Sequence, residues 1–153
     1  MIARSTESAR SSDTGQALES IGALGLERVA TLREGRRLIF NDGVRERTKG
    51  AWLVYAIVNP DGSCWKVGQT GLRGPGKPAM NPGWSRLSSY RRVLAGRCGD
   101  RPGEVVKGQQ ILAEVQEGAQ MFIMFSANPL ADEHRLSQLL QPTESGRKAT
   151  GPS

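Results

Sequence analysis

A phenol and an amine come close together in this chain, on two short segments rich in strand-forming residues. Tyr55 lies in the apolar run 52–58, and Lys66 lies in a second such run after an Asn-Pro-Asp-Gly turn. If those four turn residues form the loop, Val58 pairs with Ser63 in a β-hairpin. Counting outward then places Tyr55 directly across from Lys66, with Cβ atoms roughly 5 Å apart on the same face. A neighbouring cation lowers the pKa of a phenol, so this pair is a candidate for acid–base chemistry.

A purely structural explanation of the same pair stays open. Tyr55 would then be an ordinary half-buried strand tyrosine, and Lys66 a solvated lysine on a sheet edge. A slip of the register by one residue would also turn the two side chains to opposite faces. The choice between these explanations depends on residues elsewhere in the chain.

Basic residues are concentrated in the middle of the sequence. The chain has 21 Lys and Arg against 15 Asp and Glu, a net charge of +6, yet no acidic residue occurs from Gly62 through Gly99. That window contains Lys66, Arg73, Lys77, Arg86, Arg91, Arg92 and Arg97, interleaved with Trp65, Trp84 and Tyr90. Cations mixed with aromatic rings are typical of a surface that binds phosphates and stacks bases, although a charge run can also be a solvated face.

The last predicted helix, residues 130–141, places a carboxylate on its apolar side. The stripe that should face the core consists of Leu130, Glu133, Leu136 and Leu140. A carboxylate removed from water needs a cation or several hydrogen-bond donors, so Glu133 is either a metal ligand or the partner of an arginine at the margin of the stripe. His134 falls on the polar side of the helix, where we expect a surface residue.

The sequence pattern around these groups predicts an α+β fold. Its core is a small three-stranded antiparallel sheet flanked by helices. Beyond the hairpin we expect a short strand at 37–40, a glycine-rich and proline-rich loop at 71–83, helices at 84–95, 104–117 and 130–141, and a strand at 120–126. In terms of domains, we expect a disordered arm at 1–15, an N-terminal helical extension at 16–49, the main domain at 50–143 and a flexible tail at 144–153.

Several classes of protein are disfavoured by composition. Two cysteines, Cys64 and Cys98, and a single histidine support neither a zinc site nor a disulfide framework, which favours a reducing, cytoplasmic setting. The longest apolar run, residues 51–58, is too short to span a membrane, and the polar N-terminus lacks the apolar core of a signal peptide.

Taken in order, these residues resemble the GIY-YIG nuclease superfamily, in particular its restriction-type or homing-like members. The tripeptide Leu53-Val54-Tyr55 is similar to the first family motif, and Lys66-Val67-Gly68 is similar to the second. Leu53 stands where the family has glycine, and Lys66 where it has tyrosine, as some restriction-type members do.

The second half of the resemblance lies on the predicted helices. Arg86 corresponds to the helical arginine of the family, and Tyr90 follows it at the spacing seen in restriction-type members. Glu133 is similar to the family glutamate, whose helix runs into a proline, here Pro142. The asparagine that usually follows this proline is absent. The resemblance covers about residues 50–143.

The resemblance implies an endonuclease that hydrolyses phosphodiester bonds of DNA with one Mg²⁺, or Mn²⁺, per site. Tyr55 would be the general base, with its pKa lowered by Lys66 and Arg86. Glu133 would hold the metal ion, and Arg86 would stabilise the non-bridging oxygens. Tyr90 would position the scissile phosphate or the attacking water. The products would carry a 5′ phosphate and a 3′ hydroxyl.

The basic window would supply the residues that bind nucleic acid: Arg73, Lys77, Arg91, Arg92 and Arg97. DNA is the expected partner, with RNA left open, and cutting both strands would need a homodimer or two successive nicks. Two alternatives remain at this stage. One is a GIY-YIG-like module that binds nucleic acid without turnover, and the other is a small basic protein that docks on an acidic partner or RNA.

Overall fold

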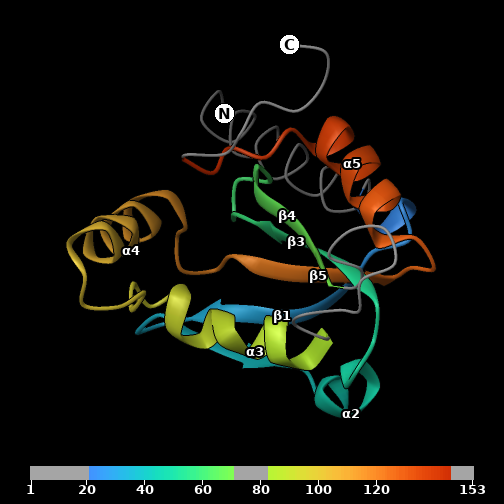
Figure 1. The fold of residues 1–153 in the computed structure, drawn as a ribbon, viewed down its shortest axis with the longest axis horizontal. Coiled ribbons are helices and arrows are strands. Elements are labelled where there is room, and N and C mark those ends of the chain that lie inside the picture. The colour runs from blue at the N-terminus through green and yellow to red at the C-terminus, as the bar shows by residue number, and fades with distance from the viewer. Residues whose placement is uncertain (1–20, 71–82, 146–153) are drawn as a thin grey trace, which may run out of the picture.

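The computed structural model describes residues 21–70 and 83–145, which form a five-stranded antiparallel sheet with helices packed on both faces (Figure 1). The strands are β1 (Glu27–Arg33), β2 (Arg37–Phe40), β3 (Leu53–Val58), β4 (Cys64–Thr70) and β5 (Gln120–Phe125), in the spatial order β2-β1-β5-β3-β4. The helices are α2 (Val44–Thr48), α3 (Gly83–Val93), α4 (Pro102–Glu114) and α5 (Pro129–Leu140). The predicted arm at 1–15, the predicted loop up to residue 82 and the end of the predicted tail lie outside the described residues.

The α+β class is confirmed, but the sheet is larger than the predicted three strands because the N-terminal extension contributes two more. The predicted strand at 37–40 is β2, which pairs with β1, and β1 pairs in turn with β5. Val29 and Leu32, which fall within the predicted helical extension at 16–49, lie in β1 and are buried. The prediction of a helical extension is therefore wrong for this segment, because pairing with β5 overrides the local pattern.

The hairpin of β3 and β4 has a different register from the one predicted. Val58 pairs with Cys64, and a bulge follows, so that Tyr55 pairs with Gly68 rather than with Lys66. The bulge accommodates Trp65, whose buried indole donates a hydrogen bond to Glu114 Oε1 over 3.0 Å. Relative to the predicted register, the residue that pairs with Tyr55 lies two positions further along β4. A displacement by two residues keeps Tyr55 and Lys66 on the same face of the sheet.

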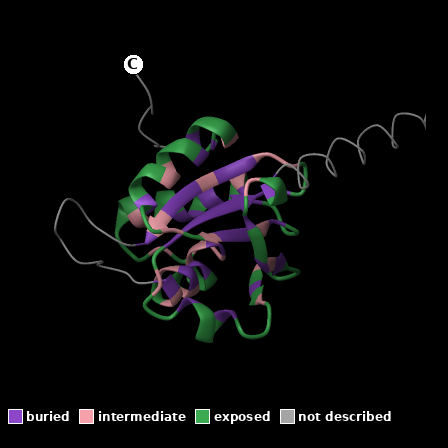
Figure 2. Cartoon of the chain, turned by 90° about the vertical axis from the view of Figure 1, so that its right-hand side faces the viewer, coloured by how far each residue is buried: buried purple, intermediate pink, exposed green. Residues whose placement is uncertain are grey.

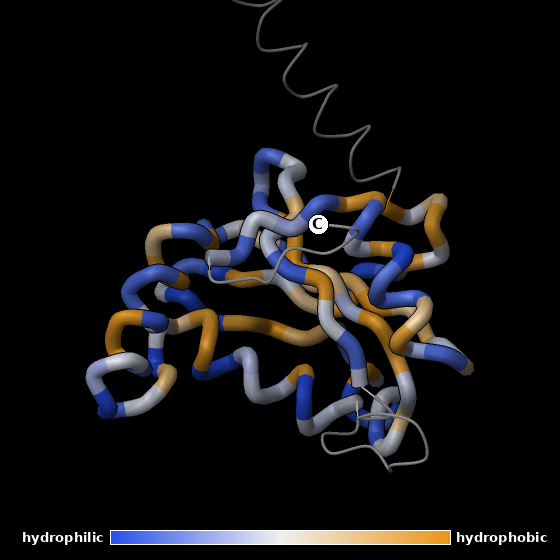
Figure 3. Tube along the Cα trace, turned by 45° about the horizontal axis from the view of Figure 1, so that its top comes forward, coloured by the Kyte–Doolittle hydropathy of each residue, from blue (hydrophilic) through white to orange (hydrophobic). Residues whose placement is uncertain are grey.

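The two faces of the sheet belong to two cores. One core contains buried residues from α3 and α4 and extends across all five strands, and α5 packs against β3 and β4 on the other face. Buried residues follow the strands in Figure 2, and the most hydrophobic stretches of the chain follow the same path in Figure 3. None of the helices described is long and apolar enough to cross a membrane.

The predicted helices are confirmed in position, but parts of their apolar stripes face solvent. In α4, Ile111 is buried whereas Leu112 is 46% exposed. In α5, Leu136 is fully buried whereas Leu130 is 44% exposed. The core-facing stripe of α5 is thus narrower than predicted, and Glu133 lies at its margin, half-buried.

Candidate functional site

Two tyrosine hydroxyls meet beneath α3. Tyr90 lies on the side of α3 that packs against the sheet, and its Oη is 2.8 Å from Oη of Tyr55 on β3. Either hydroxyl can donate this hydrogen bond. The rings pack edge to face with centroids 5.4 Å apart. Because Tyr55 is only 1% exposed and Tyr90 5% exposed, the pair is enclosed by the core.

Gly68 provides the space that the Tyr55 phenol occupies. A Cβ atom at position 68 would lie 2.3 Å from Tyr55 Oη and 2.4 Å from Cζ, closer than atoms in a folded protein can pack. Gly68 is also the residue that pairs with Tyr55 across the hairpin. The absence of a side chain at Gly68 therefore allows the phenol to lie close to β4.

Burial sets the acidity of both phenols. It raises the pKa of Tyr55 well above its ordinary value, and it raises the pKa of Tyr90 to about 12. Lys66 and Arg86 act in the opposite direction on the Tyr55 pKa but do not outweigh burial. The expectation that these cations lower the pKa of Tyr55 below its ordinary value is therefore wrong for the structure described, and both phenols are protonated at neutral pH.

Arg86 has an unused hydrogen-bond donor. Its Nε is buried without a partner, and the side chain of Arg86 makes no hydrogen bond or ion pair within the described part of the chain. Two other described side chains also have a buried atom without a partner, Arg36 at Nη2 and Gln69 at Oε1. Arg36, however, uses its remaining nitrogens to bind the backbone carbonyls of Leu94 and Val115.

The carboxylate of Glu133 is also without a hydrogen bond or ion pair to any residue that the structure describes. Burial raises the pKa of this carboxyl, and the positive charges of Lys66 and Arg86 oppose that shift. These two cations therefore act on both Glu133 and Tyr55. The carboxylate and Tyr55 are thus under the electrostatic influence of the same two basic groups.

The described residues contain no group of three or more His, Cys, Asp or Glu side chains that could hold a metal ion. A site built from one carboxylate, completed by water and a phosphate oxygen, needs only Glu133. A half-buried carboxylate without a protein partner fits such a site.

Lys66 forms an ion pair that the sequence did not predict. Its Nζ lies 3.0 Å from Oε2 of Glu144, and the two side chains are only 25% and 18% exposed. Glu144 follows α5 by four residues and also tends to raise the pKa of Tyr90. The only sequence signal was a carboxylate shortly after Pro142, in the region where the family has its asparagine.

The predicted nucleic-acid-binding residues are divided between the two flanks of α3. The guanidinium of Arg91 lies 5.2 Å from the ring centroids of Phe40 and Trp84.

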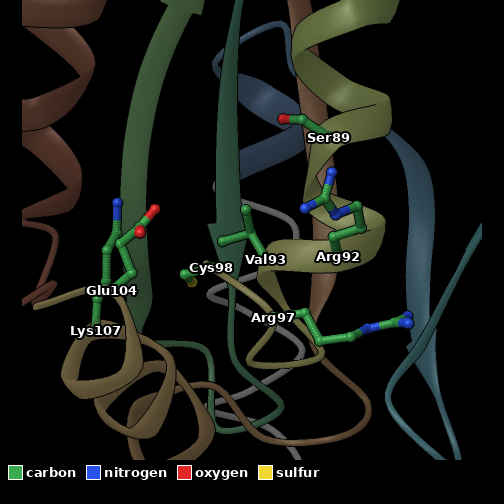
Figure 4. Close-up of a pocket in the computed structure, with 7 residues that line it drawn as sticks. All are labelled: Ser89, Arg92, Val93, Arg97, Cys98, Glu104 and Lys107. Atoms are coloured by element: carbon green, nitrogen blue, oxygen red, sulfur yellow. The ribbon is translucent and has the colours of Figure 1, made fainter. Parts of the chain in front are cut away.

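Arg92 and Arg97 line a hollow of about 270 Å³ between α3 and α4 (Figure 4). Its lining also includes Ser89, Val93, Cys98, Glu104 and Lys107. Lys107 is a cation that sequence reasoning missed, and Arg97 turns its guanidinium away from it (Figure 4). Arg73 and Lys77 lie outside the described residues.

His134 is exposed, and its Nε2 lies 3.2 Å from Gln138 Nε2, which confirms its predicted surface position.

Comparison of the chain with family models, with curated proteins and with solved structures finds no match. The function must therefore be argued from the residues of the site.

Proposed function

We propose that the protein is a metal-dependent endonuclease that hydrolyses phosphodiester bonds of DNA by a GIY-YIG-type mechanism. The observation that carries the proposal is the convergence of four kinds of group on one region: a phenol pair, two cations, a carboxylate without a partner and an unused arginine donor. The order of these residues along the chain agrees with the resemblance to that superfamily.

The proposed reaction begins with an attacking water. Tyr55 accepts its proton as general base, the water oxygen bonds to phosphorus, and the bond from phosphorus to the 3′ oxygen breaks. The 3′ oxygen then takes a proton from solvent, which leaves a 5′ phosphate and a 3′ hydroxyl. Tyr90, which is hydrogen-bonded to Tyr55, holds that phenol in place and orients the water or the phosphate.

The raised pKa of Tyr55 has a direct consequence for this step. Only a small fraction of the phenol is ionised near pH 7, so the base acts from a minor protonation state. Lys66 and Arg86 favour that ionised state. The rate of the proposed reaction should therefore increase with pH well above neutrality.

The two cations have a second task at the phosphate. Charge accumulates on the non-bridging oxygens in the transition state, and preorganised donors stabilise it. Arg86 is the best placed because its Nε is desolvated and has no partner among the described residues. Lys66 already has one anionic partner, Glu144, and adds positive charge at the same site.

Glu133 would hold the metal ion through its carboxylate. When bound, Mg²⁺ or Mn²⁺ would supply positive charge that stabilises the leaving oxygen. The hollow that contains Arg92, with Lys107 across from it, would contact phosphates away from the cleaved bond.

A second candidate function is nucleic-acid binding without turnover. Two observations favour it: the pKa of Tyr55 is raised, and the charge of Lys66 is balanced by Glu144. Such a protein would bind DNA or RNA in a salt-dependent manner and would not cut it.

A plasmid-nicking assay separates the two functions. The endonuclease should convert supercoiled DNA to open circles in Mg²⁺ or Mn²⁺, and EDTA should stop the reaction. Salt-dependent DNA binding with no nicking under either condition would favour the binding module and contradict the endonuclease.

A further inference from the structure

Glu144 makes the only ion pair that a candidate site residue forms within the described part of the chain. Its carboxylate approaches Lys66 Nζ to 3.0 Å, and both side chains are mostly buried. Exposed ion pairs contribute little because solvent screens them, but a mostly buried pair holds its partners more firmly. The pair therefore fixes the position of the Lys66 ammonium.

The backbone on either side of Glu144 is fixed to the edge of the sheet. Thr143 N donates to Cys64 O over 3.1 Å, and Glu144 N donates to Trp65 O over 2.9 Å. Ser145 N then donates to Oε1 of Glu114, the carboxylate oxygen that also accepts the Trp65 indole hydrogen bond. We call residues 143–145 the strap. At Glu144 and Ser145 the prediction of a flexible tail is wrong, because the strap is hydrogen-bonded to β4 and α4.

Lys66 needs such a constraint more than a rigid side chain would. A lysine ammonium sits on a flexible four-carbon stem and loses rotamer entropy when it is held in one position. Glu133 is a second carboxylate on which this ammonium acts, since Lys66 favours its charged form. If Lys66 moved to pair with Glu133, it would occupy the carboxylate that the proposed function assigns to the metal ion.

We propose that Glu144 is a positioning residue: the strap holds its carboxylate against Lys66, which keeps the ammonium at the phosphate site and away from Glu133. This inference rests on the proposed endonuclease function. It assigns Glu144 no contact with substrate, so its effect on the reaction must pass through Lys66.

A double-mutant cycle tests that dependence. Glu144→Gln keeps the shape of the side chain but removes its charge, and it should lower kcat by roughly 10 to 100-fold, since small misplacements at a site have effects of that size. The KM for DNA should stay the same or fall, because an anion near the phosphate site is lost. In a Lys66→Ala background, Glu144→Gln should cause no further loss. Glu117→Gln, at an exposed glutamate bound to Gly35 N, is the matched control.

A second measurement does not depend on catalysis. Acetylation of lysines by an amine-reactive reagent, followed by mass spectrometry, should modify Lys66 slowly in the unaltered protein. Glu144→Gln should speed the modification of Lys66 several-fold. The exposed lysines Lys49 and Lys107 should react at the same rate in both proteins and serve as internal standards.

The outcomes distinguish the two proposals. Absence of cleavage by the unaltered protein would overturn the endonuclease, and with it the role of Glu144 in the reaction. Cleavage with additive losses in the double mutant, or with no loss in Glu144→Gln, would overturn this inference alone. Unchanged reactivity of Lys66 in Glu144→Gln would show that Glu144 does not hold the ammonium, and would also overturn it.

Discussion

The two flanks of α3 carry arginines in opposite situations. Arg86 and Arg91 are five residues apart, so at about 100° per residue they point to different sides of the helix. Arg91 is exposed and packs over Phe40 and Trp84, whereas Arg86 is partly buried with its Nε unpartnered. A cation whose contacts are already made supports the fold, and a desolvated cation with an unused donor is suited to a ligand.

The glutamates near the site show the same contrast. The carboxylate of Glu144 is paired with Lys66, whereas the carboxylate of Glu133 has no hydrogen-bonding or ionic partner in the residues described. Both are partly buried. We infer that one carboxylate arranges the site and the other is open to a metal ion.

The largest effect is expected from Tyr55→Phe, which removes only a hydroxyl. Loss of a general base should lower kcat by about 10² to 10⁴-fold. In the unaltered protein, kcat should rise about tenfold per pH unit from pH 7 to 9, because the raised pKa leaves the ionised fraction growing over that whole range. Single-turnover rates across this range provide the measurement. A flat profile would contradict Tyr55 as the base.

The flanks themselves can be compared by Arg86→Ala and Arg91→Ala. Loss of Arg86 should lower kcat by about 10² to 10³-fold, as removal of one preorganised donor does. Arg91→Ala should keep kcat within a few-fold and lower the free energy of unfolding by about 1 kcal/mol through loss of the aromatic contacts. Cleavage kinetics and urea denaturation of both variants give the comparison. Equal losses of kcat would remove the distinction between the flanks.

Gly68→Ala tests the packing beneath the phenol pair. The added methyl would meet Tyr55 Oη, so the free energy of unfolding should fall by roughly 1 to 3 kcal/mol, and the pairing with Tyr90 should be disturbed. Gly103→Ala, where nothing lies within 4 Å of the added atom, is the control and should not lose stability. Urea denaturation provides the measurement. A fully stable Gly68→Ala variant would show that the Tyr55 phenol packs less tightly against β4 than described.

The smallest effect concerns the basic hollow between α3 and α4. Arg92→Ala should weaken binding to all DNA sequences alike and reduce the slope of log Kd against log salt by about one, the value for one lost phosphate contact. Fluorescence anisotropy with a short duplex at several salt concentrations gives the slope. An unchanged slope would exclude Arg92 from the DNA-binding surface.

The sequence predicted the elements of the main domain because their patterns are local. The turn after Val58, the helix that contains Arg86 and the strand at 120–126 are all present near their predicted bounds. The register of the hairpin was not predictable, because the bulge at Trp65 depends on a contact with Glu114, which is far away in the sequence. The pairing of Val58 with Cys64 and the bulge each shift the register by one residue. Because the sum is two residues, Tyr55 and Lys66 still share one face of the sheet.

The parts of the site that the sequence did not predict depend on tertiary contacts. The direction of the Tyr55 pKa follows from enclosure by α3, which outweighs the charge of Lys66. Glu144 reaches Lys66 only because the strap returns to β4. Likewise, β1 is a strand only because β5 is there to pair with it.

We propose that Glu133 serves metal-dependent cleavage while the basic surface binds DNA. The most direct measurement compares the unaltered protein with Glu133→Gln in a plasmid-nicking assay in Mg²⁺, with DNA binding measured in parallel and Glu117→Gln as control. We expect Glu133→Gln to lose nicking and to keep its affinity for DNA, while the control keeps both. Nicking by Glu133→Gln at the rate of the unaltered protein would remove Glu133 from the cleavage mechanism.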